Sequence, residues 1–397
     1  MKKLIKVVFG TIIFCIIFSL KPFVSIRIGK YPIDRIGPYT VTPEIWKRKK
    51  QLSKIKSIDL WGHIRSRVPN TFLYKIVSRE VRFVPIYVYS SLELFFKVFN
   101  LNKLSKNFFL RAYTRDTKNI IDNFDPILKL TDKEKREAEF ILKSHKIDLS
   151  KKIVCINVRD SFFLKKIFPN FDSSYHNRRD AEIDNYLEVI KYLISKDYLV
   201  IRMGKFMKKK VNFKHPNFID YSFCEFKTDL LDVYFGYRCF MTISSGSGWD
   251  SIPYSFRKPI LYTNFSSHSK LQLSSVRHMS IFKLVKNNNN QYLNIKELLD
   301  NDLNLITNIY EEKKSLVSNL NYIENTSEDL LSAVKEFENY VNSDYKLNQE
   351  QIKYNKNFLS NFKAENVKDI YGEPAHSEVL NGVISSSFLK KYEEILF

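Results

Sequence analysis

Charged residues suited to binding phosphate follow two apolar runs of this chain. Residues 153–156 lead into Arg159 and Asp160, and residues 198–201 lead into Arg202. In an open α/β sheet, ligands bind at the carboxyl ends of the strands. A guanidinium donates two parallel hydrogen bonds to a phosphate. The two runs therefore predict a site for an anionic ligand, most simply a phosphate group.

Two further clusters lie near these strand ends in the expected fold. The segment 176–180 reads His-Asn-Arg-Arg-Asp and precedes an amphipathic helix. The segment 244–248 reads Ser-Ser-Gly-Ser-Gly and lies between an expected strand and an expected helix. A Gly/Ser loop that opens a helix presents backbone N–H groups and the positive end of the helix dipole. Such a loop predicts a cradle for a pyrophosphate.

Each signal also has a structural alternative. Arg159 and Asp160 could form an ion pair at a strand end, residues 176–180 a solvated loop, and residues 244–248 only a tight turn. The sequence contains no Walker-type loop, no G-x-S-x-G serine and no metal-ligand spacing. We therefore expect no bound metal and no cofactor.

From residue 151 onward, the elements that position these residues alternate between strand and helix. Such alternation is typical of parallel βαβ units. From about residue 293 we expect helices, one of them capped near Thr326. The expected strands cover 153–158, 198–203, 219–221, 239–244 and 259–262, and the expected helices cover 182–196, 229–236 and 248–256.

The N-terminal part is less regular. Residues 30–38 read as a loop, and residues 42–56 are ambiguous between helix and strand. Strands are expected over 23–29 and 57–61, and helices over 70–81, 91–99 and 131–147. We divide the chain into a hydrophobic anchor (1–21), an N-terminal α/β domain (22–148), a C-terminal α/β domain (149–345) and a helical extension (346–397).

The overall composition narrows the class of partner. A chain of 397 residues with 44% hydrophobic content is long enough for two folded domains. A net charge of +21 fits a phosphorylated substrate, an anionic membrane surface or nucleic acid. No nucleic-acid-binding motif accompanies the charge, so we do not expect nucleic acid as a partner. The four cysteines lack zinc-site or redox spacing, which favours a reducing compartment.

The N-terminus predicts membrane attachment. Residues 7–20 carry no charge. This uncharged run is shorter than the ~20 residues that a helix needs to span a membrane. No small-residue cleavage site follows them. We expect residues 4–20 to be an uncleaved anchor or an in-plane helix, although a buried first helix is an alternative. Basic residues soon after this helix place the main body on the cytoplasmic side of the inner membrane.

Several segments resemble a bacterial family of glycosyltransferases found with surface-polysaccharide genes. The resemblance extends from about residue 22 to residue 340. The arginine motif is also similar, more loosely, to the phosphate-binding segment of fucosyltransferases. The resembling segments are DRIG (34–37), IDL (58–60), VCINVRDS (154–161), the run 176–205, FIDYS (218–222), SGSG (245–248), RKPILYTN (257–264) and ENTSEDLLSAVKEF (324–337).

The resemblance implies a GT-B-like α/β fold, in which two Rossmann-like domains face a cleft and the C-terminal one holds a nucleotide-sugar donor. A membrane-associated N-terminal helix and a helical C-terminal part complete the expected fold. Enzymes of this type usually stabilise the departing diphosphate with positive side chains rather than a metal. The implied site residues are Arg159, Asp160 and Asp180 as catalytic; Arg178, Arg179, Arg202, Gly204, Lys205, Ser244, Ser245, Gly246, Ser247, Gly248 and Asn264 around the donor; and Asp34, Arg35 and Gly37 on the acceptor side.

Two departures from the family pattern leave the catalytic base open. Pro38 and Asn157 stand where the family pattern has histidine. Asp160, Asp180 and Asp34 are the carboxylate candidates for the base. The expected function is transfer of a sugar from a nucleotide-diphosphate donor to a glycan or lipid-linked acceptor. The alternatives are a nucleotide-sugar epimerase or hydrolase, a non-catalytic membrane-associated glycan-binding protein, and a polyanion binder.

Overall fold

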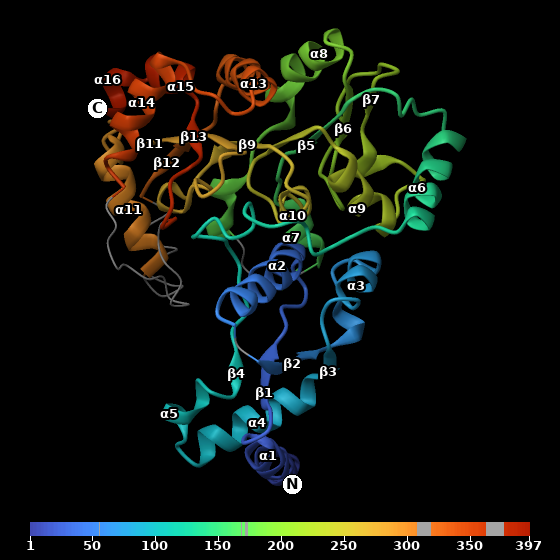
Figure 1. The fold of residues 1–397 in the computed structure, drawn as a ribbon. Helices are drawn as coiled ribbons and strands as arrows, with labels where there is room; N and C mark the ends of the chain where they lie inside the picture. The colour runs from blue at the N-terminus through green and yellow to red at the C-terminus, as the bar shows by residue number, and fades with distance from the viewer. Residues whose placement is uncertain (55, 168, 171–173, 308–318, 363–376) are drawn as a thin grey trace. The chain divides into compact units, whose positions relative to one another are not determined.

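The computed structural model describes residues 1–397 except 55, 168, 171–173, 308–318 and 363–376. It divides into two compact units (Figure 1). Unit 1 comprises Met1–Asp116 and Asn123–Asp132, and unit 2 comprises Thr117–Asp122 and Lys133–Phe397. Each unit contains a parallel sheet, so the predicted α/β class is confirmed. The division lies at the first residue of helix α6 (Asp132–Ser144), whereas the sequence suggested a boundary after residue 148.

Unit 1 is built on a four-stranded sheet with the order β3-β2-β1-β4. Every neighbouring pair is parallel. Strands β2 and β3 extend the sheet on one side of β1, and β4 lies on the other side of β1. The strand order therefore reverses between β1 and β4. The strands are β1 (Ser25–Lys30), β2 (Ser57–His63), β3 (Phe83–Pro85) and β4 (Phe109–Leu110).

Alternate side chains of these strands pack against helices on the two faces of the sheet. Ile26 and Ile28 pack with residues of α1 (Lys2–Leu20) and α4 (Ile86–Val98). On the other face, Trp46 of α2 (Ile36–Leu52) donates a hydrogen bond of 2.8 Å to the carboxylate of Asp59. The remaining helices of unit 1 are η1 (Arg65–Arg67), α3 (Thr71–Val77) and α5 (Asn102–Ser105).

Helix α2 differs from the expectation of a loop to residue 38 followed by an ambiguous segment. It begins at Ile36 and includes both Pro38 and Pro43. A proline in the first turn loses no helical hydrogen bond, since the N–H groups there have no partner within the helix. Residues 39–46 are all buried. Their burial stabilises the helix despite Pro43.

Unit 2 contains a seven-stranded parallel sheet with the order β13-β10-β9-β8-β5-β6-β7. Numbered along the chain, this is the 3-2-1-4-5-6 order of a doubly wound Rossmann sheet with one further strand at the edge. The order reverses between β5 and β8. The strands are β5 (Ile153–Asn157), β6 (Leu199–Arg202), β7 (Phe218–Ile219), β8 (Met241–Ser244), β9 (Ile260–Phe265), β10 (His278–Phe282) and β13 (Val383–Ile384).

Helices cover both faces of this sheet (Figure 1). Val154 and Ile156 belong to a core shared with α8 (Leu187–Ser195) and α13 (Ser327–Asn342). Cys155 points to the other face, where its Sγ lies 3.9 Å from a carbonyl of α9 (Asp229–Arg238). The other helices are α7 (Phe162–Ile167), η2 (Ser174–Arg179), η3 (Ile183–Tyr186), η4 (Tyr221–Phe223), α10 (Ser251–Ser255), η5 (His268–Lys270), α11 (Ile295–Thr307), α14 (Gln349–Leu359), α15 (Ser386–Lys391) and α16 (Glu393–Leu396).

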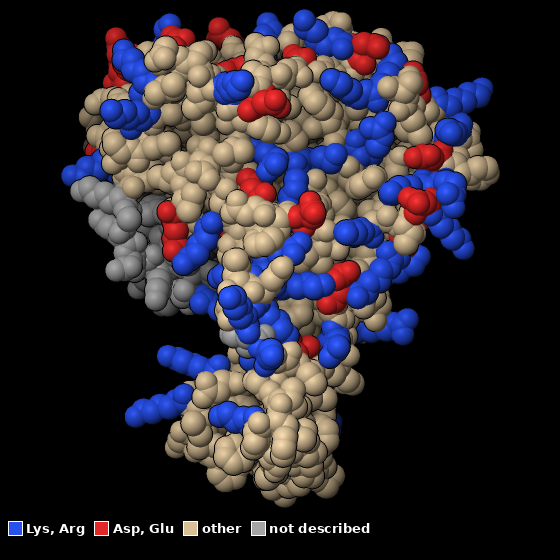
Figure 2. Space-filling model, viewed as in Figure 1, with Lys and Arg blue, Asp and Glu red and all other residues tan. Residues whose placement is uncertain are grey.

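The C-terminal part is not helical throughout. Strand β12 (Asn321–Ile323) pairs antiparallel with β11 (Leu284–Lys286), and β13 joins the main sheet beside β10. The predicted capped helix is confirmed, because Thr326 and Asp329 form a reciprocal capping box at the start of α13. On the face drawn in Figure 2, lysines and arginines outnumber acidic side chains, as the net charge predicts.

Candidate functional site

The candidate site lies in unit 2, where the strand order reverses between β5 and β8. Ligands of open α/β sheets bind at this switch point, outside the carboxyl ends of the strands. Two hydrogen bonds join the ends of β5 and β8. The Ser245 N–H donates to the Asn157 carbonyl at 3.0 Å, and the Arg159 N–H donates to Ser245 Oγ at 2.7 Å. The structure thus brings together two segments that the sequence singled out separately.

Asp180 lies beside Arg159 at this position. Arg159 Nη1 forms an ion pair with the Asp180 carboxylate and donates to the His176 carbonyl at 3.1 Å. The Asp180 backbone carbonyl accepts a hydrogen bond of 2.6 Å from Lys283 Nζ. Lys283 is only 3% exposed, and it was missed by the sequence analysis. The one feature of the sequence that could have indicated its burial is its position as a single charge within the apolar stretch 281–285.

The Asp180 carboxyl group titrates closer to neutrality than an ordinary aspartate. Burial raises its pKa, Arg159 lowers it and Asp160 raises it again, with a net pKa of about 6. A carboxylate with such a pKa can accept a proton efficiently near pH 7. This pKa is compatible with the base role that the sequence suggested for Asp180, and that role stays a prediction.

Hydrogen bonds within the turn over residues 244–248, and to residues beside it, fix its conformation. Gly246 has φ of +77°, and its N–H donates to Ser244 Oγ at 3.1 Å. Ser247 Oγ accepts hydrogen bonds from the Asn157 side chain and, at 3.2 Å, from the Trp249 N–H. Arg179 Nη2 donates to the Gly246 carbonyl at 2.7 Å, which attaches the 176–180 segment to the turn.

The expectation that this turn opens a helix directly is wrong. Helix α10 begins at Ser251 and has five residues, and Asp250 occupies its N-cap position. The N–H groups of Ser245 and Gly246 already have partners within the protein. The predicted cradle of free backbone N–H groups at the start of a helix is therefore not formed by Ser245 and Gly246.

Asp250 is a second carboxyl group with a raised pKa, and the sequence analysis also missed it. Burial raises the pKa of Asp250 to about 7, although a hydrogen bond of 2.9 Å from Ser244 Oγ opposes that rise. It directly follows the SGSGW segment. That position was the only signal for it in the sequence.

Arg178 and Asp160 hold the loops that surround these residues. Arg178 donates to the Ser266 carbonyl and lies 3.5 Å from the carboxylate of Asp302. Asp160 accepts hydrogen bonds of 2.9 Å from the N–H groups of Phe162 and Lys208. Asp160 therefore joins the loop after β5 to the loop after β6.

Two predicted donor-binding residues are buried and hydrogen-bonded within unit 2. Arg202 is 1% exposed and donates to the Lys209 carbonyl at 2.8 Å and to Asp220 at 3.2 Å. Asn264 is fully buried and exchanges two backbone–side-chain hydrogen bonds with Asn325. Burial and these hydrogen bonds favour a structural role for both side chains over contact with a ligand.

The other two predicted donor residues lie in the loop after β6. Gly204 has φ of +152°, and a Cβ at this position would lie 2.5 Å from Met207 Sδ. Lys205 is exposed. The lack of a side chain at Gly204 therefore allows the backbone conformation and the close packing of this loop. The donor role of Lys205 stays a prediction.

The predicted acceptor-side residues lie in unit 1, after the carboxyl end of β1. Asp34 has φ of +68° and accepts two hydrogen bonds from the Arg67 guanidinium, at 2.9 and 2.5 Å. Arg35 is exposed at the N-cap of α2, and Gly37 lies in the first turn of that helix. Their acceptor-side role stays a prediction.

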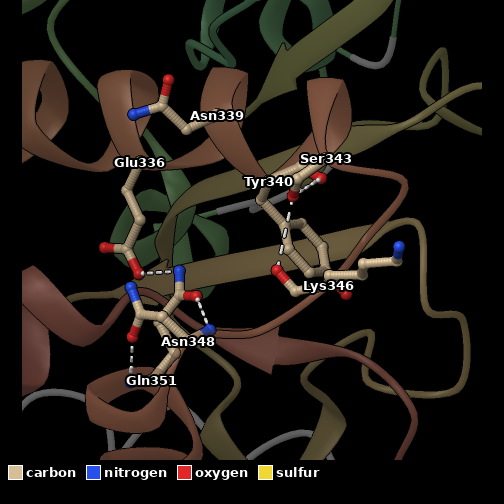
Figure 3. A pocket seen from close by; sticks show the side chains of 7 residues that line it. All are labelled: Glu336, Asn339, Tyr340, Ser343, Lys346, Asn348 and Gln351. Atoms are coloured by element: carbon tan, nitrogen blue, oxygen red, sulfur yellow. Dashed lines mark hydrogen bonds between the residues drawn. The ribbon is translucent and has the colours of Figure 1, made fainter.

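A separate cavity of about 280 Å³ lies near the junction of α13 and α14 (Figure 3). Glu336 points toward Gln351, which donates to it at 2.9 Å. Burial raises the Glu336 pKa, but hydrogen bonds from Ser385, Gln351 and Ser386 together hold it below the usual value. The Glu336 carboxylate therefore joins α13 to the C-terminal segment.

Within the described residues, no group of three or more His, Cys, Asp or Glu side chains is placed to hold a metal ion. The expectation that the protein needs no metal stays a prediction. Helix α1 is the one described helix long and apolar enough to cross a membrane, by length and composition.

No protein-family model and no curated protein matches this chain. Two solved structures align with most of it at 10% sequence identity. A glycosyl transferase family 9 protein from Veillonella parvula DSM 2008 covers 79% of this chain and 98% of its own, with a TM-score of 0.44. The E. coli ADP-heptose LPS heptosyltransferase II covers 74% of this chain and 99% of its own, with a TM-score of 0.38.

Proposed function

We propose that this protein is a glycosyltransferase that transfers a sugar from a nucleotide-diphosphate donor to a glycan or lipid-linked acceptor. The observation that supports the proposal most is the joining of β5 and β8 at the switch point of unit 2. There the Arg159 backbone N–H donates to Ser245, Arg179 donates to the Gly246 carbonyl, and Asp180 is paired with Arg159. The arrangement combines cations for a diphosphate with a carboxylate that titrates near neutrality.

In the proposed reaction, an acceptor hydroxyl forms a bond to the anomeric carbon of the sugar while the bond from that carbon to the diphosphate oxygen breaks. Asp180 accepts the hydroxyl proton. The departing diphosphate gains negative charge, which Arg159 and Arg179 stabilise. The reaction needs no metal, since the side chains supply the positive charge.

Both units have parallel sheets whose order begins 3-2-1-4, which supports a GT-B type of enzyme with two Rossmann-like domains. Unit 1 carries the acceptor side through Asp34, Arg35 and Gly37. The enzyme works in surface-polysaccharide synthesis on the cytoplasmic face of the inner membrane, to which α1 attaches it.

Binding of the donor tests the proposal directly. The purified full-length chain is heated with UDP-, GDP-, dTDP- and CMP-sugars, and one nucleotide-diphosphate sugar is expected to raise the melting temperature. The CMP-sugar, which lacks a diphosphate, is the matched control. If no nucleotide-diphosphate sugar stabilises the protein at millimolar concentration, the proposal is wrong.

Turnover then distinguishes transfer from the other reactions of a nucleotide sugar. The stabilising donor is incubated with and without a membrane extract that contains glycan and lipid-linked acceptors, in the presence of EDTA. We expect release of the nucleoside diphosphate to depend on the extract and to persist with EDTA. Release or isomerisation of the sugar without any acceptor would instead identify a hydrolase or an epimerase.

A further inference from the structure

Helix α1 presents a continuous apolar stripe on its outer side. Leu4, Val8, Ile12 and Ile16 recur at intervals of four residues, so they lie along one side of the helix. Each of these side chains is more than half exposed. The part of unit 1 that contains α1 and α4 shows a mostly uncharged surface in Figure 2. Isolated exposed apolar residues are common in proteins, but a continuous stripe of them marks an interaction surface.

The opposite side of α1 is fixed to unit 1. A Cβ at Gly10 would lie 2.2 Å from the Ser91 carbonyl oxygen, so α1 and α4 approach each other closely. The Phe14 ring stacks on Phe95 with 4.8 Å between centroids. Ile17 is 5% exposed and packs in the same core. Helix α1 is therefore part of the unit 1 fold rather than a separate tail.

Further exposed apolar side chains lie after α1 and in the neighbouring helices α4 and α5. Phe23, which follows the helix, is almost fully exposed. Val98 and Phe99 at the end of α4 and Leu104 in α5 are exposed as well. We call these residues and the stripe on α1 the apolar face.

Cationic residues accompany the apolar face. The first 33 residues contain no aspartate or glutamate. Between residues 86 and 106 the only acidic residue is Glu93, which accepts a hydrogen bond of 2.8 Å from Tyr89. The lysines of these segments are Lys2, Lys3, Lys6, Lys21, Lys30, Lys97, Lys103 and Lys106. A surface that is both apolar and cationic complements an anionic lipid bilayer.

We propose that the apolar face binds to the surface of an anionic phospholipid bilayer. In this arrangement α1 lies parallel to the membrane plane and does not cross the bilayer. Helix α1 has 19 residues and is about 28 Å long, close to the ~30 Å of the hydrocarbon layer. Helix α4, which packs beside it, has 13 residues and is only about 20 Å long. A crossing α1 would draw α4, with Glu93 and the adjoining sheet, into the hydrocarbon. An in-plane α1 inserts only its apolar stripe.

This inference deepens the membrane attachment in the proposed function, but its test needs neither donor nor acceptor. The full-length chain is transferred from mild detergent to preformed vesicles of phosphatidylcholine, with or without phosphatidylglycerol at 30 mol %, and bound protein is separated by flotation. We expect binding at least about tenfold tighter to the vesicles with phosphatidylglycerol. Failure to bind them, with donor binding intact, would overturn this inference alone.

Variants define the docking surface. We expect Ile12→Asp and Phe99→Asp each to weaken vesicle binding by about tenfold or more, since each places a charge in the apolar face. Leu52→Asp is the matched control, because Leu52 is an exposed leucine of α2, on the other face of the sheet. Circular dichroism and urea unfolding confirm that each variant is folded. If Phe99→Asp behaves like Leu52→Asp, α1 inserts alone and the proposed face is wrong.

The depth of α1 distinguishes lying from crossing. A fluorescent dye is attached to an exposed cysteine at position 4, 12 or 20, through Leu4→Cys, Ile12→Cys or Leu20→Cys in a chain with Cys15→Ser and Cys224→Ser, in which the remaining Cys155 and Cys239 are buried. Lipids that carry a quencher at a shallow or a deep position report the depth of each dye. We expect the same shallow depth at all three positions. A deep position 12 between shallow ends would show a crossing helix, and concentration-dependent dimers without vesicle binding would show a self-association surface.

Discussion

Arg159 and Asp180 form an ion pair that connects the loop after β5 to the segment before α8. The pair lies at the reversal of the strand order, and it is joined to the β8 turn through the Arg159 N–H and Ser245. One residue of the pair can neutralise a phosphate, and the other can accept a proton.

Replacing Arg159 with alanine should weaken binding of the stabilising nucleotide sugar by about tenfold or more, since a charge-assisted hydrogen bond contributes about 1.5–3 kcal/mol. Isothermal titration calorimetry measures the affinity. Arg277→Ala is the matched control, because Arg277 is also paired with an aspartate in unit 2, Asp122 at 2.9 Å. Equal affinities of the Arg159→Ala variant and the unaltered protein would remove Arg159 from the site.

The rate of transfer should rise with pH through an apparent pKa of about 6, because burial keeps Asp180 protonated below that value. Asp180→Asn should lower kcat by at least about 100-fold and abolish this limb of the pH profile. Profiles of kcat against pH for both proteins check the prediction. A limb at the same pH in the Asp180→Asn variant would assign the proton transfer to another group.

Asp250 should make the protein less stable as the pH rises. Its pKa is raised by burial to about 7, so the native state keeps a proton that the unfolded chain releases near pH 4. This contribution to the free energy of unfolding is complete below about pH 4 and is lost as the pH rises through 7. Between pH 5 and pH 8, the melting temperature of the unaltered protein should therefore fall relative to that of Asp250→Asn. Parallel curves of melting temperature against pH would contradict the raised pKa.

Arg202→Ala should destabilise unit 2 by about 3–5 kcal/mol, because Asp220 loses its buried partner. The affinity of the folded protein for the nucleotide sugar should stay unchanged. Urea unfolding and calorimetry below the unfolding transition measure the two effects. A tenfold loss of affinity in folded Arg202→Ala would restore the donor role that the sequence suggested.

Thr326→Ala should lower the free energy of unfolding of unit 2 by about 1 kcal/mol through loss of the α13 cap. Thr326→Ser keeps the hydroxyl group and serves as the control. Urea denaturation of the three proteins measures the difference. Equal destabilisation by both substitutions would mean that the capping hydrogen bond contributes little.

The sequence alone determined the α/β class and the positions of the longer elements. Strand β5, helix α9 and the capping box of α13 follow from local patterns of apolar, charged and capping residues. Such patterns act within a few residues, so they can be read along the chain. The convergence of Arg159 and Asp180 was expected only from the rule that ligands bind at strand ends.

Only the tertiary structure shows which partner each charged residue meets. Arg159 and Arg202 look alike in sequence, since each follows an apolar strand. Arg202 becomes buried against Asp220, which follows the neighbouring strand β7, whereas Arg159 meets Asp180 and the β8 turn. Lys283 and the two-residue strand β13 likewise take their places through partners far away in the chain. Burial and pairing depend on these distant contacts, and therefore only the folded chain fixes them.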